Sequence, residues 1–268
     1  MKIKKYIFTL LFLVLTVSFS WAQGEYIANT KSFTTEDGLS HLGVYCFEKD
    51  SKGVLWVGTR DGLNRFDGRK FKVFTKENGL VNSGAVEKPI VLKQGTNLLW
   101  IAQDQGLAKY NLATGKIDII RYPKTAENYQ EFRELRALAL DEHGNLWIGT
   151  YKNGVYIYNT THKTFTHLDE NNGLSHPEVL KIMRDNDNNM WVGTGNGANL
   201  WLPDKQRFRV YKMDEADEQA LLGSIVQDIY QAKNGAIWIA TQKGLNLYQP
   251  NSQTFKHYSV LNGLATSL

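Results

Sequence analysis

The chain has one cysteine, Cys46, among its 268 residues. An internal disulfide is therefore impossible, and stability has to come from packing. Cys46 lies in a predicted strand between Tyr45 and Phe47, so we interpret it as a small buried hydrophobic residue rather than a reactive thiol. The six histidines include no His-Glu-x-x-His spacing, the signature of one class of zinc proteases.

Long apolar runs are scarce as well. The run from Ile7 to Phe19 is shorter than the ~20 residues that a membrane-spanning helix needs. Three lysines precede it, and Ser20-Trp21-Ala22 follows it, which is the pattern of a secretory signal. Residues 1–22 are therefore a predicted signal peptide, cut between Ala22 and Gln23. We expect residues 23–268 to be periplasmic or secreted and to contain no transmembrane segment.

The exported chain also lacks a strong net charge. The formal charge is +4, and removal of a signal peptide with three lysines and no acidic residue lowers it to +1. A nearly neutral chain gives no indication of a nucleic-acid-binding surface.

What the chain does contain is a repeated apolar phrase around a tryptophan, as in Leu55-Trp56-Val57-Gly58-Thr59 and Leu146-Trp147-Ile148-Gly149-Thr150. The five tryptophans are 44, 47, 44 and 47 positions apart, and a fixed period of this length is typical of repeat architectures. We interpret them as packing residues between repeats. They are Trp56, Trp100, Trp147, Trp191 and Trp238.

One repeat contains four short strand-like runs. In the first copy they are Val44 to Phe47, Leu55 to Thr59, Leu63 to Phe66 and Lys70 to Thr75, with Asp-Gly pairs marking two hairpin turns. Four antiparallel strands in about 45 residues are one blade of a β-propeller. The sequence thus predicts an all-β propeller with five four-stranded blades. The repeats are expected near residues 40–80, 81–125, 130–172, 174–215 and 221–261.

Two further motifs recur around the strands. Asp50-x-x-Gly53-x-x-Trp56 returns at Asp141, and a variant at Asp185 has Asn188 in place of the glycine. Because asparagine is the residue other than glycine that best tolerates the left-handed backbone, these aspartates are expected to shape a turn rather than perform chemistry. Between the repeats stands a Gly-Leu pair, as in Asp37-Gly38-Leu39-Ser40-His41 and Asn172-Gly173-Leu174-Ser175-His176.

Together these motifs resemble the two-component regulator propeller repeat, and the resemblance covers residues 25 to 268. It implies the periplasmic sensor region of a hybrid two-component system, of the kind by which Bacteroides-type bacteria sense polysaccharide breakdown products. The family's propellers have seven blades and are followed by a β-sandwich, a membrane helix and a histidine kinase. The resemblance therefore implies a partial propeller that binds a small molecule or oligosaccharide, without a cofactor, metal or catalytic activity of its own. The resemblance also allows dimerisation through downstream domains, and the exposed ends of a partial propeller should favour self-association of the chain.

Both ends of the sequence fit a partial propeller. The stretch from Tyr26 to Thr35 is similar to the fourth strand of a preceding blade. The stretch from Asn262 to Leu268 is similar to the opening of a sixth repeat, whose tryptophan would lie past the last residue.

Two other functional classes stay open. The Asp-x-x-Gly-x-x-Trp turn also resembles the Asp-box of sialidases, but the arginines form no pattern that suits a sialidase site. A plain protein-interaction scaffold is the other alternative. An EF-hand calcium site at Asp185 to Asn189 is excluded, because Met190 and Asn196 stand where that loop needs glycine and glutamate. The acidic run from Asp214 to Glu218 is interpreted as solvated surface.

A ligand site has to come from residues that the repeats do not share. In propellers the loops between blades and the turns between second and third strands lie on one face, so we place the ligand there by analogy with the fold. The insertions from Lys124 to Glu134 and from Asp214 to Gln219 belong to these loops. The candidate ligand contacts are His41, Arg60, Gln103, Tyr151, Asn196 and Gln242.

Overall fold

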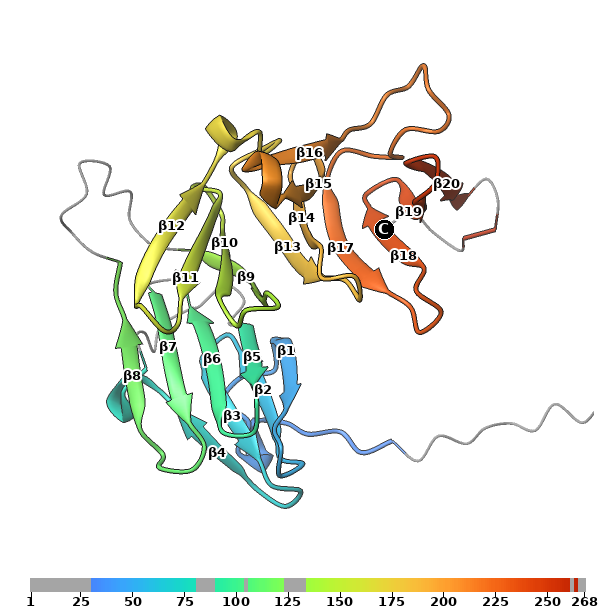
Figure 1. Ribbon diagram of the computed structural model, residues 1–268. Helices are drawn as coiled ribbons and strands as arrows, with labels where there is room; N and C mark the ends of the chain where they lie inside the picture. Colours follow the sequence, from blue (N-terminus) through green and yellow to red (C-terminus); the bar gives the residue numbers. More distant parts are fainter. Residues whose placement is uncertain (1–29, 81–89, 104–105, 123–133, 261–262, 265–268) are drawn as a thin grey trace, which may run out of the picture. The chain divides into compact units, whose positions relative to one another are not determined.

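The computed structural model describes residues 30–80, 90–103, 106–122, 134–260 and 263–264. Its compact unit runs from Thr34 to Leu268, and the described residues form twenty strands in five four-stranded antiparallel sheets. The five predicted blades are therefore confirmed. In each sheet the strands are hydrogen-bonded in chain order (Figure 1).

The strand bounds repeat with the period of the sequence. Blade one comprises β1 (Val44–Lys49), β2 (Leu55–Thr59), β3 (Gly62–Phe66) and β4 (Phe71–Phe74). Blade two comprises β5 (Ile90–Gln94), β6 (Leu98–Gln103), β7 (Gly106–Asn111) and β8 (Ile117–Ile120). Blade three comprises β9 (Leu135–Leu140), β10 (Leu146–Thr150), β11 (Val155–Asn159) and β12 (Thr164–Leu168). Blade four comprises β13 (Val179–Arg184), β14 (Met190–Thr194), β15 (Gly197–Leu202) and β16 (Arg207–Tyr211). Blade five comprises β17 (Val226–Gln231), β18 (Ile237–Thr241), β19 (Gly244–Gln249) and β20 (Thr254–Tyr258).

Turn residues with positive φ explain why the strands end where they do. Gly62, which opens β3, has a φ of 141°, and a Cβ there would lie 2.7 Å from the carbonyl oxygen of Phe74. Only glycine fits this place. In the turn before the tryptophan, Gly53 has a φ of 80° and Asn188 a φ of 67°. The substitution of asparagine for glycine in blade four therefore marks a left-handed residue, as the sequence predicted.

Successive blades pack through their first strands and through four apolar clusters. The strands β1, β5, β9, β13 and β17 contact one another in that order. Each cluster joins the tryptophan of one blade to apolar side chains of the next, for example Trp147 to Val179 and Ile182. The glycine after the tryptophan permits this approach, because a Cβ at Gly149 would overlap the Val179 side chain.

The burial of the tryptophans follows this packing. Trp56, Trp100, Trp147 and Trp191 are between 0 and 2% exposed, as predicted for packing residues. Trp238 is less well covered than the other four and is only half-buried. Its place in blade five faces the side on which a following blade would pack, and none of the described residues forms one.

Trp201 stands outside the repeated phrase but is buried as well, since only 9% of it is accessible. Its ring packs edge to face against Trp147 of the preceding blade at 6.0 Å and against Phe208 at 4.9 Å. The third strand therefore also contributes a large aromatic side chain to the interface between blades.

The described helical elements are single 3-10 turns: η1 (Thr35–Asp37), η2 (Lys76–Asn78), η3 (Glu170–Asn172) and η4 (Pro203–Lys205). The turns η1, η2 and η3 directly precede the Gly-Leu pairs between blades, and η4 lies between β15 and β16. Thr34 caps the start of η1 and Asp169 the start of η3. Each turn ends at a glycine in the left-handed conformation, Gly38 for η1 and Gly173 for η3. Residues 124–133 of the first insertion lie outside the described residues.

The N-terminal strand predicted from Tyr26 to Thr35 is not seen in its described part, since residues 30–34 have no regular structure and Thr35 begins η1. No helix among the described residues is long and apolar enough to span a membrane.

Candidate ligand-binding face

The repeated aspartates hold the tryptophans in place. One carboxylate oxygen of Asp185 accepts a hydrogen bond from the Trp191 indole N–H at 2.9 Å, and the other accepts the backbone N–H groups of Asp187 and Asn189. Asp50 and Asp141 make the same set of contacts. These carboxylates are engaged in a structural turn, as the sequence predicted.

Blade two keeps the same contact with a different residue. Gln94 stands six positions before Trp100, where the other blades have aspartate, and its Oε1 accepts the indole N–H at 2.8 Å. The sequence alone could have predicted this contact, because Gln94 keeps the six-residue spacing to the tryptophan although the rest of the turn differs from the other blades. In blade five the place is taken by Ala232, which has no side-chain acceptor.

The candidate residues come from one end of the blades. In blade one the first residue of β1 pairs with the last of β2, Val44 with Thr59, so the loop before β1 and the β2–β3 turn lie together. Neighbouring blades are joined at this end, because the Gly154 N–H donates to the Pro177 carbonyl and the Gly197 N–H to the Ser224 carbonyl. The predicted grouping of turns and inter-blade loops is therefore present in these blades.

A buried asparagine braces this end, and the sequence analysis did not find it. Asn64 is fully buried; its Oδ1 accepts the Ser40 N–H and its Nδ2 donates to the Val57 carbonyl. The Ser40 hydroxyl also meets that of Thr59 at 2.7 Å. The same asparagine recurs in blades four and five, eight positions after the tryptophan, as Asn199 and Asn246, and this spacing was the available signal.

Two of the candidates also brace loops. His41 Nδ1 accepts the Gly43 N–H at 2.7 Å, and His176 makes the equivalent bond to Glu178. In blade five Gly223 stands in the position of the histidine. There the Oε1 of Gln242 takes over as the acceptor and binds the Ile225 N–H at 2.8 Å. These contacts fix the loops of the candidate face.

The other candidates lie in the turns between second and third strands. The exposed Arg60 side chain makes no hydrogen bond or ion pair with the part of the chain that the structure describes. Asn196 is half-buried, and its backbone N–H donates to Thr194 Oγ1. The Tyr151 ring lies under the guanidinium of Arg136, 4.3 Å from its centre. Gln103 is the last residue of β6.

Other chemical features lie outside this face or act structurally. Among the described residues no three His, Cys, Asp or Glu side chains are grouped to hold a metal ion. Cys46 is half-buried, and burial raises the pKa of its thiol, which disfavours the reactive thiolate. Residues of blades four and five, including Asp185 and Gln231, line a hollow of about 490 Å³ at the opposite end of the strands.

Comparisons with known proteins agree with the repeat pattern. A family model described as "Two component regulator propeller" matches residues 38–61, 132–152, 173–196 and 220–243. The chain belongs to the two-component regulator propeller family. The matched segments hold the tryptophan phrases of blades one, three, four and five, and those of blades one and four begin at the Gly-Leu pairs Gly38-Leu39 and Gly173-Leu174.

Solved structures place the family in the extracellular domains of regulatory proteins. One is described as a hybrid two component system of B. thetaiotaomicron; it is 25% identical, with a TM-score of 0.69 over 85% of this chain and 30% of that one. Another, described as a one component system of the same organism, is 26% identical, with a TM-score of 0.65 over 80% of this chain and 27% of that one. The chain thus spans less than a third of these domains.

A shorter match has a higher sequence identity. Histidine kinase P4 of Formosa agariphila is 61% identical over 44 residues, which are 16% of this chain and 3% of that protein. This propeller is therefore of the kind found in the extracellular sensor domains of two-component systems.

Proposed function

We propose that this regulator propeller is exported to the periplasm, where it binds an extracellular nutrient, an oligosaccharide, and signals its presence without catalysing a reaction. The observation that carries the proposal is that, within each blade, the repeated residues have structural roles and the residues that differ between blades lie together in the turns. Repeated residues such as Asp50, Trp56 and Asn64 are used in turns and cores. The turn residues that differ between blades are gathered at one end.

The chemistry of that end suits a hydroxyl-rich ligand. Arg60 supplies several donors, Asn196 both a donor and an acceptor, and Tyr151 an aromatic ring. The inter-blade loops beside these turns are held by hydrogen bonds that the Asn64 Oδ1 and the His41 Nδ1 accept, so binding does not have to order those loops first.

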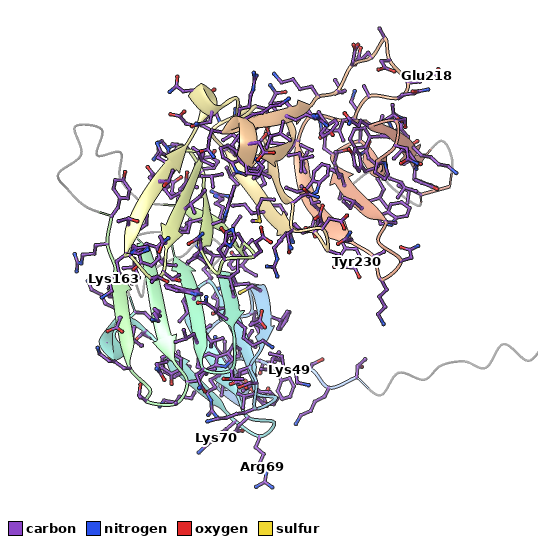
Figure 2. The ribbon with its side chains drawn as sticks, viewed as in Figure 1. Lys49, Arg69, Lys70, Lys163, Glu218 and Tyr230 are labelled. Carbon is purple, nitrogen blue, oxygen red and sulfur yellow. The ribbon has the colours of Figure 1, made fainter. Side chains whose placement is uncertain are left out.

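Screening the exported chain on an array of neutral and acidic glycans, followed by calorimetry, tests the proposal. The double variant Arg60→Ala with Asn196→Ala should lose binding of the glycan that the parent chain selects. Arg69→Ala is the matched control, because Arg69 is an exposed arginine in the β3–β4 turn, at the other end of β3 (Figure 2). Unchanged binding by the double variant, and by a variant with all of Arg60, Gln103, Tyr151, Asn196 and Gln242 replaced by alanine, would place the site elsewhere.

Export is tested separately. Mass spectrometry of the chain recovered from the periplasmic fraction should show an N-terminus at Gln23. A chain that keeps residues 1–22 and stays in the cytoplasm would contradict the periplasmic location.

A further inference from the structure

Two cations stand directly opposite each other on the outer strands of blade one. In the pairing of the strands, Trp56 of β2 is opposite Arg65 of β3, and Arg65 is opposite Lys72 of β4. Residues paired in this way share one face of the sheet, here the face of Trp56, which packs on blade two. Because like charges directly opposite each other destabilise a sheet, blade one retains this pair at a cost in stability.

The other blades have no such pair in the same row. Blade two places a cation opposite an acid, blade three has no charge there, and blades four and five place one cation opposite a leucine. The pairs are Lys109 with Asp118, Ile157 with Thr166, Leu200 with Arg209 and Leu247 with Lys256. The facing cations are therefore a feature of blade one and not of the repeat.

A third cation joins them around one hollow. Lys52, in the β1–β2 turn, lines this hollow with Arg65 and Lys72, and its other walls include Trp56 and, from blade two, Tyr110. The volume is about 130 Å³, which holds several waters but is well below the ~300–1,000 Å³ of small-molecule pockets. It therefore suits a small ion. We call it the basic hollow, and none of the six candidate contacts lines it.

The charges around the basic hollow are not balanced. Among the residues that line it, Asp50 is the one acid, so three cations and one carboxylate leave two positive charges. Both oxygens of the Asp50 carboxylate are already engaged. One accepts the Trp56 indole N–H, and the other accepts two backbone N–H groups of the turn.

The three cations have no ion-pair partner in the part of the chain that the structure describes. Asp67, which follows Arg65 by two positions, lies outside the hollow, and one of its carboxylate oxygens accepts two backbone N–H groups of the β3–β4 turn. The Lys72 ammonium lies 5.2 Å from the centre of the Phe74 ring, a contact that keeps it beside the hollow.

We infer that the basic hollow binds a tetrahedral oxyanion, a sulfate or phosphate group. Lys52, Arg65 and Lys72 approach the anion from one turn and two strands, and the planar guanidinium of Arg65 donates to two of its oxygens. The bound anion offsets the repulsion between Arg65 and Lys72. This site lies at the end of the strands away from the proposed saccharide face and does not rest on that proposal.

NMR of the tryptophan indole N–H groups tests the inference, because Trp56 lines the hollow. The exported chain is titrated with sodium sulfate and sodium phosphate at constant ionic strength, against sodium chloride as the reference salt. The Trp56 signal should shift and reach saturation. The Trp191 signal is the internal control: its indole N–H also donates to an aspartate, but in its hollow Asp187 and Leu200 take the places of Lys52 and Arg65. Equal shifts of both signals would overturn the site.

Variants separate binding from folding. Arg65→Gln should weaken oxyanion binding about ten- to a hundredfold, the scale of one charged hydrogen-bond partner, and Lys72→Gln should act in the same direction. Lys109→Gln is the matched control, because Lys109 has the place of Arg65 in blade two, beside Trp100, and should leave the affinity unchanged.

Thermal unfolding checks that lost binding is not lost folding. In chloride, Arg65→Gln should have a Tm no lower than the parent chain, because it removes the repulsion between facing cations. Sulfate or phosphate should raise the Tm of the parent chain more than that of Arg65→Gln. Parent-like oxyanion affinity in the double variant Arg65→Gln with Lys72→Gln would overturn the site.

Titrations with a glucose sulfate ester, free sulfate and glucose identify the source of the anion. Tighter binding of the ester assigns the hollow to a sulfated saccharide, and tighter binding of free sulfate or phosphate assigns it to the inorganic ion. A Trp56 signal that none of these anions moves would overturn the site. Loss of glycan binding at the turns with the Trp56 shift retained would count against saccharide sensing alone.

Discussion

Replacing Asp185 with alanine should destabilise the chain by about 2–4 kcal/mol, although Asp185 lies away from the candidate ligand face. Asp185 is 4% exposed, and its carboxylate accepts the indole N–H of Trp191, which is 1% exposed. This N–H is buried in the folded chain, and a buried donor left without its partner costs about 1–3 kcal/mol. The lost bonds to the N–H groups of Asp187 and Asn189 add about 1 kcal/mol, the scale of a helix cap.

Urea unfolding followed by far-UV circular dichroism measures this effect. Asp187→Ala is the matched control, because the Asp187 side chain is exposed and the turn uses only its backbone N–H. Ala232→Asp is the converse change in blade five. It supplies the missing acceptor to Trp238, but Trp238 is half-buried and reaches water, so the gain should stay below about 1 kcal/mol. Equal unfolding midpoints for Asp185→Ala and Asp187→Ala would refute the reasoning.

Three other results are expected. Gly193→Ala should cost about 1–3 kcal/mol in thermal unfolding, because its Cβ would lie 2.6 Å from the Val226 side chain of the next blade; an unchanged Tm would contradict this. Burial raises the pKa of Tyr156 to about 12, so the folded state holds this proton more tightly than the unfolded state. Stability present below pH ~10 should therefore decline as the pH rises through 12, and less so in Tyr156→Phe; identical urea curves for both chains would argue otherwise. Phe47 is 63% exposed on β1, so the chain should self-associate through this apolar surface. Light scattering should show less association for Phe47→Asp, and a strictly monomeric parent chain would contradict the prediction.

The pH dependence has a simple physical origin. Ionised tyrosine is charged, and a charge is disfavoured where water is excluded, so burial is the main cause of the shift at Tyr156. Tyr248 shows the same direction, with the nearby Tyr211 hydroxyl adding to the effect of burial.

Much of the blade could be predicted because its signals are local. The Asp-Gly turns, the left-handed Asn188 and the strand lengths depend on neighbouring residues, and the fixed spacing of the tryptophans carries them from one blade to the next. The roles of Gln94 and of the buried Asn64 could also have been predicted, because each stands at a fixed distance from the tryptophan of its blade. Those two were missed because a single glutamine or asparagine is common on surfaces, and only its position relative to the tryptophan distinguishes it.

The candidate site was predictable only in part. The sequence placed Arg60, Tyr151 and Asn196 in turns, and the pairing of the strands confirms that their end of the blade also holds the inter-blade loops. The basic hollow has no sequence signature, because Arg65 and Lys72 face each other only through the pairing of their strands.

The amino-acid sequence by itself therefore determined the repeat, the blade and the family, since all three depend on short-range patterns that recur at a fixed interval. The tertiary structure alone decided how deeply each repeated residue is buried. Trp191 and Trp238 stand in nearly the same phrase, yet one is 1% exposed and the other half-buried, because burial depends on the apolar face that the next blade supplies. Trp201, outside the phrase, is covered for the same reason: its ring meets Trp147 of a neighbouring blade.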